Sequence, residues 1–227
     1  MENMRNIEFD GKFDALLCLD GTLPGVGKIT GLGNLPILAA DGAAIRRMEM
    51  GIKPDYIIGD LDTFGAHPFS KNKIDSVIIE DKSQEINDFE KSLVFALSRG
   101  FLNILIMGMH GGELEHTLNN WSVLIKFSKK LTLTFYEDER YGLPLDYPAR
   151  FKVFNGEMVS LIPQPVARLT TRNLFWELNN EYLRLGEREG SRNIATGEIV
   201  EIGLHEGSLF VFISSRYPNA PVVKQES

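Results

Sequence analysis

The sequence predicts an α/β fold in two domains. A Rossmann-like, mostly parallel sheet domain is expected at residues 1–140, followed by a smaller all-β sandwich or barrel at residues 141–227. In the first part, short apolar runs alternate with stretches of helical periodicity, as in parallel sheets covered by helices. From about residue 141, proline and glycine separate short runs that lack helical periodicity, which is typical of a small all-β domain. A polar segment at residues 137–148 marks the boundary.

Six strands are expected in the first domain, because strands buried on both faces form nearly continuous apolar runs. These runs are Phe13–Leu19, Pro36–Ala40, Tyr56–Gly59, Ser76–Glu80, Asn103–Met107 and Leu131–Tyr136. Helical periodicity lies between the runs, at Ala43–Met50, Asp88–Arg99 and His116–Lys129. The helix at Asp88 has the clearest start, because Asn87 is a favourable N-cap and acidic residues in the first turn complement the helix dipole.

Only strands are expected in the second domain, since its apolar runs are short and turn residues separate them. The runs are Phe151–Phe154, Met158–Leu161, Ala167–Thr171, Glu181–Leu185, Ile199–Ile202 and Leu209–Ile213. The sequence contains no internal repeat and no low-complexity tract, so neither domain is predicted to be a repeat array.

The composition is that of an ordinary globular protein, with 43% of the 227 residues hydrophobic and 24% charged. It excludes a disordered or collagen-like chain, and no apolar stretch approaches the ~20 residues that span a bilayer. The net charge is −7 and no basic block stands out, so neither nucleic acid nor an anionic membrane is an expected partner. Charges occupy the positions where a secretory signal would be apolar, so a cytoplasmic location is expected.

Several common catalytic signals are absent or incomplete. Gly25–Lys28 lacks the spacing of a Walker A loop, and Cys18 stands where a D-x-D-G-T phosphatase motif has its nucleophilic aspartate. None of the four histidines has the spacing of zinc ligands, and no G-x-S-x-G elbow is present. Cys18, the single cysteine, is expected to be a small buried apolar residue.

A group of carboxylates follows the expected strands. Asp60 and Asp62 come directly after Tyr56–Gly59, Asp41 follows an earlier apolar run, and Asp88 opens a helix. Any one of them alone is more often a turn or cap residue. As a group they meet at the carboxyl edge of the sheet, where ligands of open α/β sheets bind. Converging carboxylates repel one another unless a cation lies among them, so a Mg²⁺ site that handles phosphates is predicted.

These carboxylates belong to an ordered set of motifs. A-D-G begins at Ala40, G-I-K-P-D-x-I-I-G-D-x-D at Gly51, Q-x-x-x-D-F-x-K at Gln84 and G-x-x-G-G-x-x-x-H-T at Gly108. The segment N-L-F-W-E-L-N-N follows from Asn173. In this order and over nearly the whole chain, the motifs resemble the thiamine pyrophosphokinase family.

The resemblance implies transfer of a pyrophosphoryl group from ATP to the hydroxyl of thiamine, with Mg²⁺ as the cofactor and AMP as the second product. It also implies a homodimer with sites shared between the subunits. The implied catalytic and metal-binding residues are Asp60, Asp62 and Asp88. The implied contacts to ATP and its phosphates are Asp41, Gln84, Lys91, Gly111, Gly112 and His116. The implied thiamine contacts are Trp176, Ser191 and Asn193.

The chain departs from the family pattern at several positions. Glu113 and Glu115 stand where the family has Arg and Asp, and Ile45, Asn87 and Arg192 replace an Asn, a Thr and a Ser. The change from Arg to Glu reverses a charge at an implied phosphate contact. Two alternatives therefore stay open. One is a Mg²⁺-dependent phosphatase, or another nucleotide-using transferase, on the same carboxylates; the other is a non-catalytic thiamine or nucleotide sensor.

Overall fold

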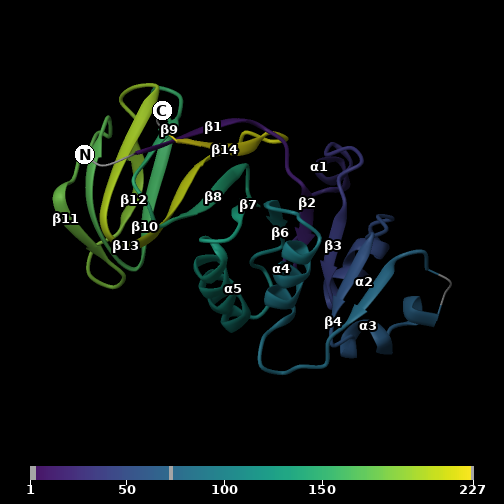
Figure 1. The fold of residues 1–227 in the computed structure, drawn as a ribbon. Coiled ribbons are helices and arrows are strands. Elements are labelled where there is room, and N and C mark those ends of the chain that lie inside the picture. Colours follow the sequence, from purple (N-terminus) through teal and green to yellow (C-terminus); the bar gives the residue numbers. More distant parts are fainter. Residues whose placement is uncertain (1–3, 72–73, 226–227) are drawn as a thin grey trace. The chain divides into compact units, whose positions relative to one another are not determined.

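The computed structural model describes residues 4–71 and 74–225, and the chain divides into two compact units (Figure 1). The α/β unit is Phe13–Glu137, and the β unit combines residues 1–12 with residues 138–227. The first expected domain began at residue 1, whereas these first residues group with the β unit. The reason is strand β1 (Arg5–Gly11), which the apolar pattern did not predict and which hydrogen-bonds to two strands of the β unit.

The sheet of the α/β unit contains the six strands expected from the sequence. They are β2 (Ala15–Cys18), β3 (Ile37–Ala40), β4 (Tyr56–Gly59), β5 (Val77–Glu80), β6 (Asn103–Met107) and β7 (Thr132–Glu137). Their order is β7-β6-β2-β3-β4-β5, and every neighbouring pair is parallel. The order reverses beside β2, because the chain runs outward to β5 and returns with β6 on the other side. Ligands of such sheets bind outside the carboxyl ends of the strands, near this reversal.

Helices connect the parallel strands. They are α1 (Val26–Thr30), α2 (Gly42–Glu49), α3 (Asp62–Ala66), α4 (Asp88–Ser98) and α5 (Leu114–Phe127), with a 3₁₀ turn η1 (Pro68–Lys71). The sequence predicted α2, α4 and α5, whereas α1 and α3 are five residues long and too short for a periodic pattern. Asn87 caps α4 as predicted, because its Oδ1 accepts a hydrogen bond from the Glu90 amide at 2.9 Å. Within the described ranges, no helix is both long and apolar enough to cross a membrane.

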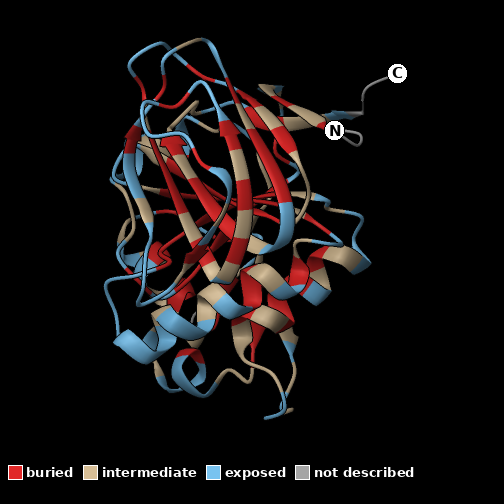
Figure 2. Ribbon diagram, turned by 90° about the vertical axis from the view of Figure 1, so that its left-hand side faces the viewer, coloured by how far each residue is buried: buried red, intermediate tan, exposed pale blue. Residues whose placement is uncertain are grey.

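The core of the α/β unit is centred on β2. All four residues of this strand are fully buried, and Figure 2 shows that buried residues concentrate in the strands while exposed ones lie on the outer sides of the helices. Cys18 is buried, as predicted. Its Sγ accepts a hydrogen bond from Nη2 of Arg47, whose side chain is also fully buried.

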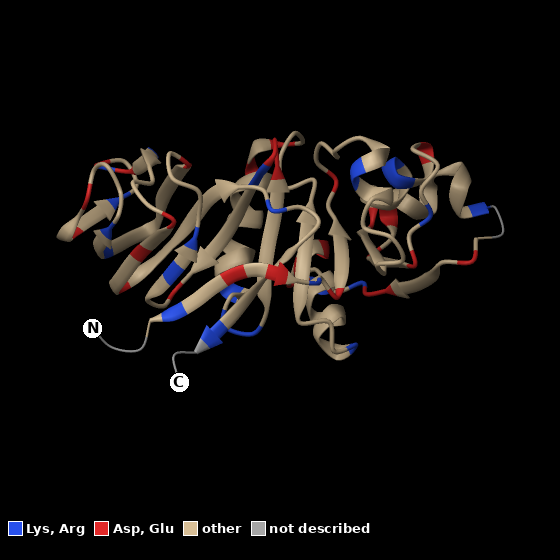
Figure 3. Cartoon of the chain, turned by 90° about the horizontal axis from the view of Figure 1, so that it is seen from above, with Lys and Arg blue, Asp and Glu red and all other residues tan. Residues whose placement is uncertain are grey.

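In its described part, the β unit is built of strands. Besides β1 they are β8 (Arg140–Leu145), β9 (Ala149–Lys152), β10 (Met158–Arg172), β11 (Asn179–Arg184), β12 (Gly190–Ile194), β13 (Ile199–Ser214) and β14 (Ala220–Gln225). The order β14-β1-β9-β13-β8 forms one path, and β10 pairs with β11, β12 and β13. The pairs are antiparallel except for β1 with β9. In both units, Lys and Arg are interspersed with Asp and Glu (Figure 3).

Two strands of the β unit are longer than expected. Strand β10 contains both Met158–Leu161 and Ala167–Thr171, and β13 contains both Ile199–Ile202 and Leu209–Ile213. The prolines between the first two runs predict a break, but the register between β10 and β13 instead shifts directly after Pro163. A proline is tolerated in a strand at such an irregularity, so the chain continues as one strand.

Candidate active site

A cavity of about 460 Å³ lies at the carboxyl edge of the parallel sheet in the α/β unit. Its walls come from the loops after β2, β3 and β6 and from the N-terminal parts of α2, α3, α4 and α5. This is the side of the sheet, beside the reversal of strand order, where ligands of such folds bind. Its charged lining residues are Asp20, Asp41, Arg46, Asp88, Glu113 and His116.

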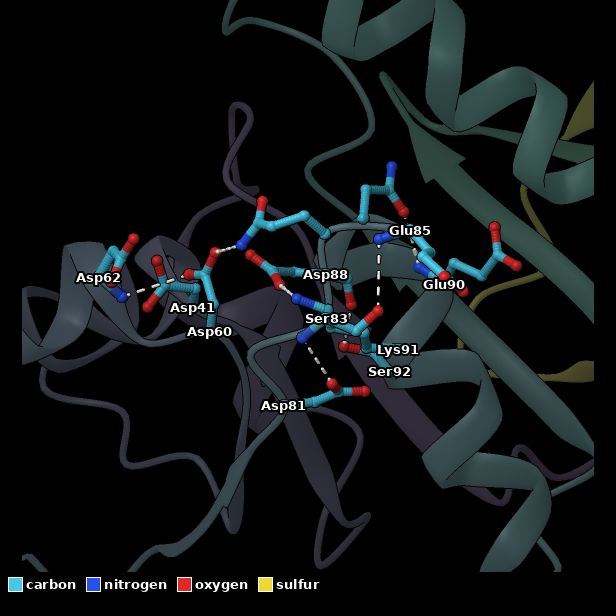
Figure 4. Close-up of polar contacts among 12 residues, drawn as sticks. Asp41, Asp60, Asp62, Asp81, Ser83, Glu85, Asp88, Glu90, Lys91 and Ser92 are labelled. Atoms are coloured by element: carbon cyan, nitrogen blue, oxygen red, sulfur yellow. Dashed lines mark hydrogen bonds and ion pairs between the residues drawn. The ribbon is translucent and has the colours of Figure 1, made fainter.

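Three carboxylates converge at this edge of the sheet (Figure 4). Asp41 follows β3, Asp60 follows β4 and Asp88 is the first residue of α4, and one oxygen of each lies within 4.8 Å of the others. Gly59 makes this approach possible. A Cβ at that position would lie 2.9 Å from Cβ of Asp41 and 3.0 Å from Cγ of Asp88, so a larger residue would push the carboxylates apart.

Asp41 is held on both of its carboxylate oxygens. Oδ1 accepts a hydrogen bond from the Phe64 amide at 3.0 Å, and Oδ2 accepts one from the Thr63 amide at 3.1 Å. These amides lie in the first turn of α3, so Asp41 caps a helix that is remote in the sequence. Its φ of +26° is unusual for a residue other than glycine, and such strained positions concentrate at functional sites.

Asp60 and Asp88 have different electrostatic surroundings. Hydrogen bonds from Nε2 of Gln84 at 3.0 Å and from the Asp62 amide at 3.2 Å lower the pKa of Asp60. Burial raises the pKa of Asp88, as does repulsion from Asp60 and Asp41, although the ammonium group of Lys91 opposes the rise. Nζ of Lys91 lies 3.0 Å from Oδ1 of Asp88, and the lysine side chain is only 3% exposed.

The cluster can hold a divalent cation. Three carboxylates face one buried ammonium group, so negative charge is in excess, and carboxylate oxygens are the ligands that Mg²⁺ binds. The set differs from the predicted Asp60, Asp62 and Asp88, because Asp41 takes the third place and the side chain of Asp62 is exposed. The prediction assumed an extended backbone after β4. Leu61 instead has a left-handed φ of +65°, so α3 begins at Asp62.

The residues predicted to contact phosphates divide into two groups. Gly112 and His116 line the cavity, although His116 also lies 3.4 Å from Glu113 in an exposed ion pair. Gln84 and Lys91 instead contact the acidic cluster. Gly111 does not line the cavity. It is needed for the conformation of the loop, because its φ is +97° and a Cβ at this position would lie only 1.9 Å from Oγ1 of Thr22.

The sequence motifs missed two charged residues of the cavity wall. Asp20 follows β2, and its Oδ1 accepts a hydrogen bond from Nε of Arg46 at 2.6 Å. The position of Asp20 one residue beyond a buried apolar run, like that of Asp41, was a signal that could have placed it at this edge.

The residues predicted to contact thiamine lie in the β unit. Trp176 is 58% exposed, and its ring meets that of Phe175 edge to face at 4.8 Å. Asn193 is buried: its Oδ1 accepts a hydrogen bond from the Trp176 amide at 3.1 Å, and its Nδ2 donates one to the Trp176 carbonyl at 2.8 Å. Asn193 therefore fixes the backbone that presents Trp176, while Ser191 is exposed on β12.

Sequence models of one protein family match both units. The model described as "Thiamin pyrophosphokinase, catalytic domain" matches residues 35–135, which lie in the α/β unit. The model described as "Thiamin pyrophosphokinase, vitamin B1 binding domain" matches residues 145–209, which lie in the β unit. The acidic cluster falls inside the first match, and Trp176 and Asn193 fall inside the second.

Individual proteins of the same name are also similar. Thiamine pyrophosphokinase 1 of Oryza sativa subsp. japonica is 28% identical over 69% of this chain, and the chain covers 64% of that relative, less than two thirds of its length. The Arabidopsis thaliana protein of that name is 28% identical over a segment that covers 82% of this chain and 73% of the length of that protein. The structure of yeast thiamin pyrophosphokinase has the same fold, with a TM-score of 0.75 at 17% identity over 94% of this chain and 91% of its own. The chain belongs to the thiamin pyrophosphokinase family.

Proposed function

We propose that the protein transfers a pyrophosphoryl group from ATP to the hydroxyl of thiamine, forming thiamine diphosphate and AMP. The observation that carries this proposal is the convergence of Asp41, Asp60 and Asp88 beside a cavity, inside the segment that the catalytic-domain model matches. Such transfer depends mainly on positioning and on stabilisation of charge, which is what clustered carboxylates and a bound cation provide.

Mg²⁺ is the proposed cofactor, with Asp60 and Asp88 as ligands. Asp41 is the third ligand that the positions of the oxygens favour, and Asp62 stays a prediction from the sequence. When bound there, Mg²⁺ would neutralise charge on the triphosphate. Gln84 and Lys91 act through the cluster in this proposal, because they donate hydrogen bonds to Asp60 and Asp88.

Asp88 is the proposed acceptor of the thiamine hydroxyl proton. Lys91 donates to its Oδ1, which leaves Oδ2 to face both the cation and the hydroxyl. The hydroxyl oxygen then bonds to the β-phosphorus of ATP. The bond from that phosphorus to the oxygen bridging to the α-phosphate breaks, and AMP leaves with the electron pair. Gly112 and His116, at the cavity wall, are proposed contacts to the donor phosphates.

Trp176 is the proposed thiamine platform, supported by Ser191 and Asn193. An indole face attracts a cation such as the thiazolium ring, and the exposed pair of Phe175 and Trp176 offers such a face. We further propose a homodimer in which each site combines the carboxylates of one chain with Trp176 of the other. The exposed aromatic pair supports this, because a second chain and a bound substrate would cover it. The cytoplasmic location stays a prediction.

The test is an assay of AMP release with ATP, Mg²⁺ and thiamine, run alongside a reaction without thiamine. Thiamine-dependent AMP formation supports the proposal. Release of inorganic phosphate without thiamine would identify a phosphatase instead. Thiamine binding without AMP formation would identify a sensor, the alternative that the reversed charge at Glu113 favours.

A further inference from the structure

The ion pair of Asp20 and Arg46 in the cavity wall has no part in the acidic cluster. Nε of Arg46 donates to Oδ1 of Asp20 at 2.6 Å, and the two side chains are 48% and 59% exposed. An ion pair so open to water adds little to folding stability. Folding stability therefore gives little reason for this contact, and its place in the cavity wall suggests a role toward a ligand.

The backbone on both sides of Asp20 is fixed. The Leu19 amide donates to the Met107 carbonyl at 2.8 Å, and the Gly21 amide donates to the Gly108 carbonyl at 3.0 Å. These bonds extend the pairing of β2 with β6 beyond the strand ends. The carboxylate of Asp20 packs over the start of α2, where a Cβ on Gly42 would lie 3.3 Å from its Cγ. A negative charge is favourable at that end of a helix.

Arg46 lies one turn further along α2, on the same face of the helix as Gly42. Asp20 accepts a hydrogen bond from its Nε, and among the described residues Asp20 is the single hydrogen-bond partner of the guanidinium group. The two terminal nitrogens of the guanidinium group therefore remain for a ligand in the cavity. A planar guanidinium fork matches the oxygens of a phosphate group and can donate two parallel hydrogen bonds to it.

We infer that Asp20 is a positioning residue that aims the terminal nitrogens of Arg46 at a phosphate group of the donor substrate. The inference deepens the proposed function and rests on it for the identity of the donor. Asp20 supplies one fixed hydrogen bond on a rigid backbone, and Arg46 supplies the contact to the anion. A guanidinium held in one orientation loses less conformational entropy when the phosphate binds.

The experiment measures calorimetric binding of inorganic tripolyphosphate with Mg²⁺, so it does not depend on thiamine or on turnover. We expect Asp20→Ala to weaken binding about tenfold, as expected for a charge-assisted contact. Arg46→Ala should weaken it at least as much, and the double variant should resemble Arg46→Ala alone. Asp20→Asn keeps an acceptor oxygen and should lose less than Asp20→Ala. Asp75→Asn breaks an exposed 3.5 Å ion pair with Lys53 outside the cavity lining and should bind like the unaltered protein.

Two results would overturn the inference. Tighter or unchanged binding by Asp20→Ala would show that the carboxylate repels the anion or has no effect on it, and additive losses would show that the two residues act independently. In the assay of AMP release, Asp20→Ala should raise KM for ATP and leave KM for thiamine unchanged, which general destabilisation would not do. If the unaltered protein binds tripolyphosphate but forms no AMP, the proposed function fails while the role of Asp20 stands.

Discussion

The two units present their predicted ligand-binding side chains in opposite ways, one by clustering charges and the other by exposing apolar surface. The α/β unit brings like charges together: Asp41, Asp60 and Asp88 meet although they are far apart in the sequence. The β unit exposes apolar surface, since Asn193 uses its buried amide to hold Trp176 at the surface. The clustered carboxylates repel one another, and a bound cation would relieve this repulsion. The exposed indole leaves an aromatic face in water, and an apolar or cationic partner would cover that face. The two units therefore suit different ligands, a metal cation in the α/β unit and an apolar or organic cationic group in the β unit.

The largest effect is expected from removing charge at the acidic cluster. Asp60→Asn should lower AMP formation on the order of a hundredfold, because a charge that stabilises the transition state through the metal is lost. Asp62→Asn should lose much less, since its carboxylate is exposed and outside the cluster. The measurement is turnover at saturating ATP, Mg²⁺ and thiamine. Thermal melting of both variants is the control. An equal loss in the two variants would restore Asp62 to the metal site as the sequence predicted.

The next effect concerns the aromatic face of the β unit. Trp176→Ala should raise KM for thiamine about tenfold, because the loss of a desolvated cation–π contact is expected to weaken binding by that order. Phe175→Ala is a matched control, since that ring is also exposed and packs against the same indole. Steady-state kinetics with varied thiamine would check both variants. Equal effects of the two changes would mean that general apolar surface, and not the indole, binds thiamine.

The proposed sharing of sites between subunits gives a complementation test. When Asp88→Asn and Trp176→Ala chains are mixed and refolded together, a mixed dimer should contain one intact site and one doubly damaged site. Activity should therefore partly return. Each variant refolded alone is the control. If mixed dimers are verified and activity does not recover, Trp176 serves its own chain.

A smaller effect is expected where the chain departs from the family pattern. Glu113→Arg should tighten ATP binding about threefold or leave it unchanged, since it replaces a repulsive charge at the cavity wall with an attractive one. The exposed pair of Glu113 with His116 would be lost, at little cost in stability. Calorimetry with a non-hydrolysable ATP analogue would measure the change. Clearly weaker binding would show that Glu113 already has a productive role.

The smallest effect is a dependence of stability on pH. The raised pKa of Asp88 means that the metal-free folded protein keeps this proton to a higher pH than the unfolded chain does. As the pH rises from the ordinary aspartate value to the folded value, Asp88 therefore lowers the free energy of unfolding. At pH values above the folded pKa of Asp88, the free energy of unfolding does not fall further through this group. The difference between melting curves of the unaltered protein and Asp88→Asn would isolate this contribution, and a difference that is independent of pH would contradict it.

Much of the α/β unit could be predicted from the sequence, because its strands are buried on both faces. An apolar run then ends where the strand ends, and the residue that follows is placed at the carboxyl edge of the sheet. This reasoning located Asp41, Asp60 and Asp88. It also predicts a metal-binding role for Asp62, whose side chain is exposed, because the left-handed residue Leu61 redirects the chain there and no apolar pattern indicates such a turn.

The remaining differences have other physical causes. Strands β10 and β13 continue through residues that usually end strands, because an irregular register accommodates Pro163. The pairing of Asp20 with Arg46 joins residues 26 positions apart, and nothing in the spacing of either one predicts it. The sequence predicts a thiamine contact for Asn193, and no local pattern indicates that its amide also hydrogen-bonds to the backbone of Trp176. Long-range side-chain contacts of this kind follow from the fold and not from local pattern.

The pairing of β1 with β14 has a consequence for how the chain folds during synthesis. Residues 5–11 are synthesised before the α/β unit and residues 220–225 after it, so β1 and β14 cannot pair until both segments have left the ribosome. The α/β unit is one continuous segment, Phe13–Glu137, and its contacts are available much earlier. Until then, β1 lacks its partner β14, although the α/β unit that follows β1 in the chain can already fold.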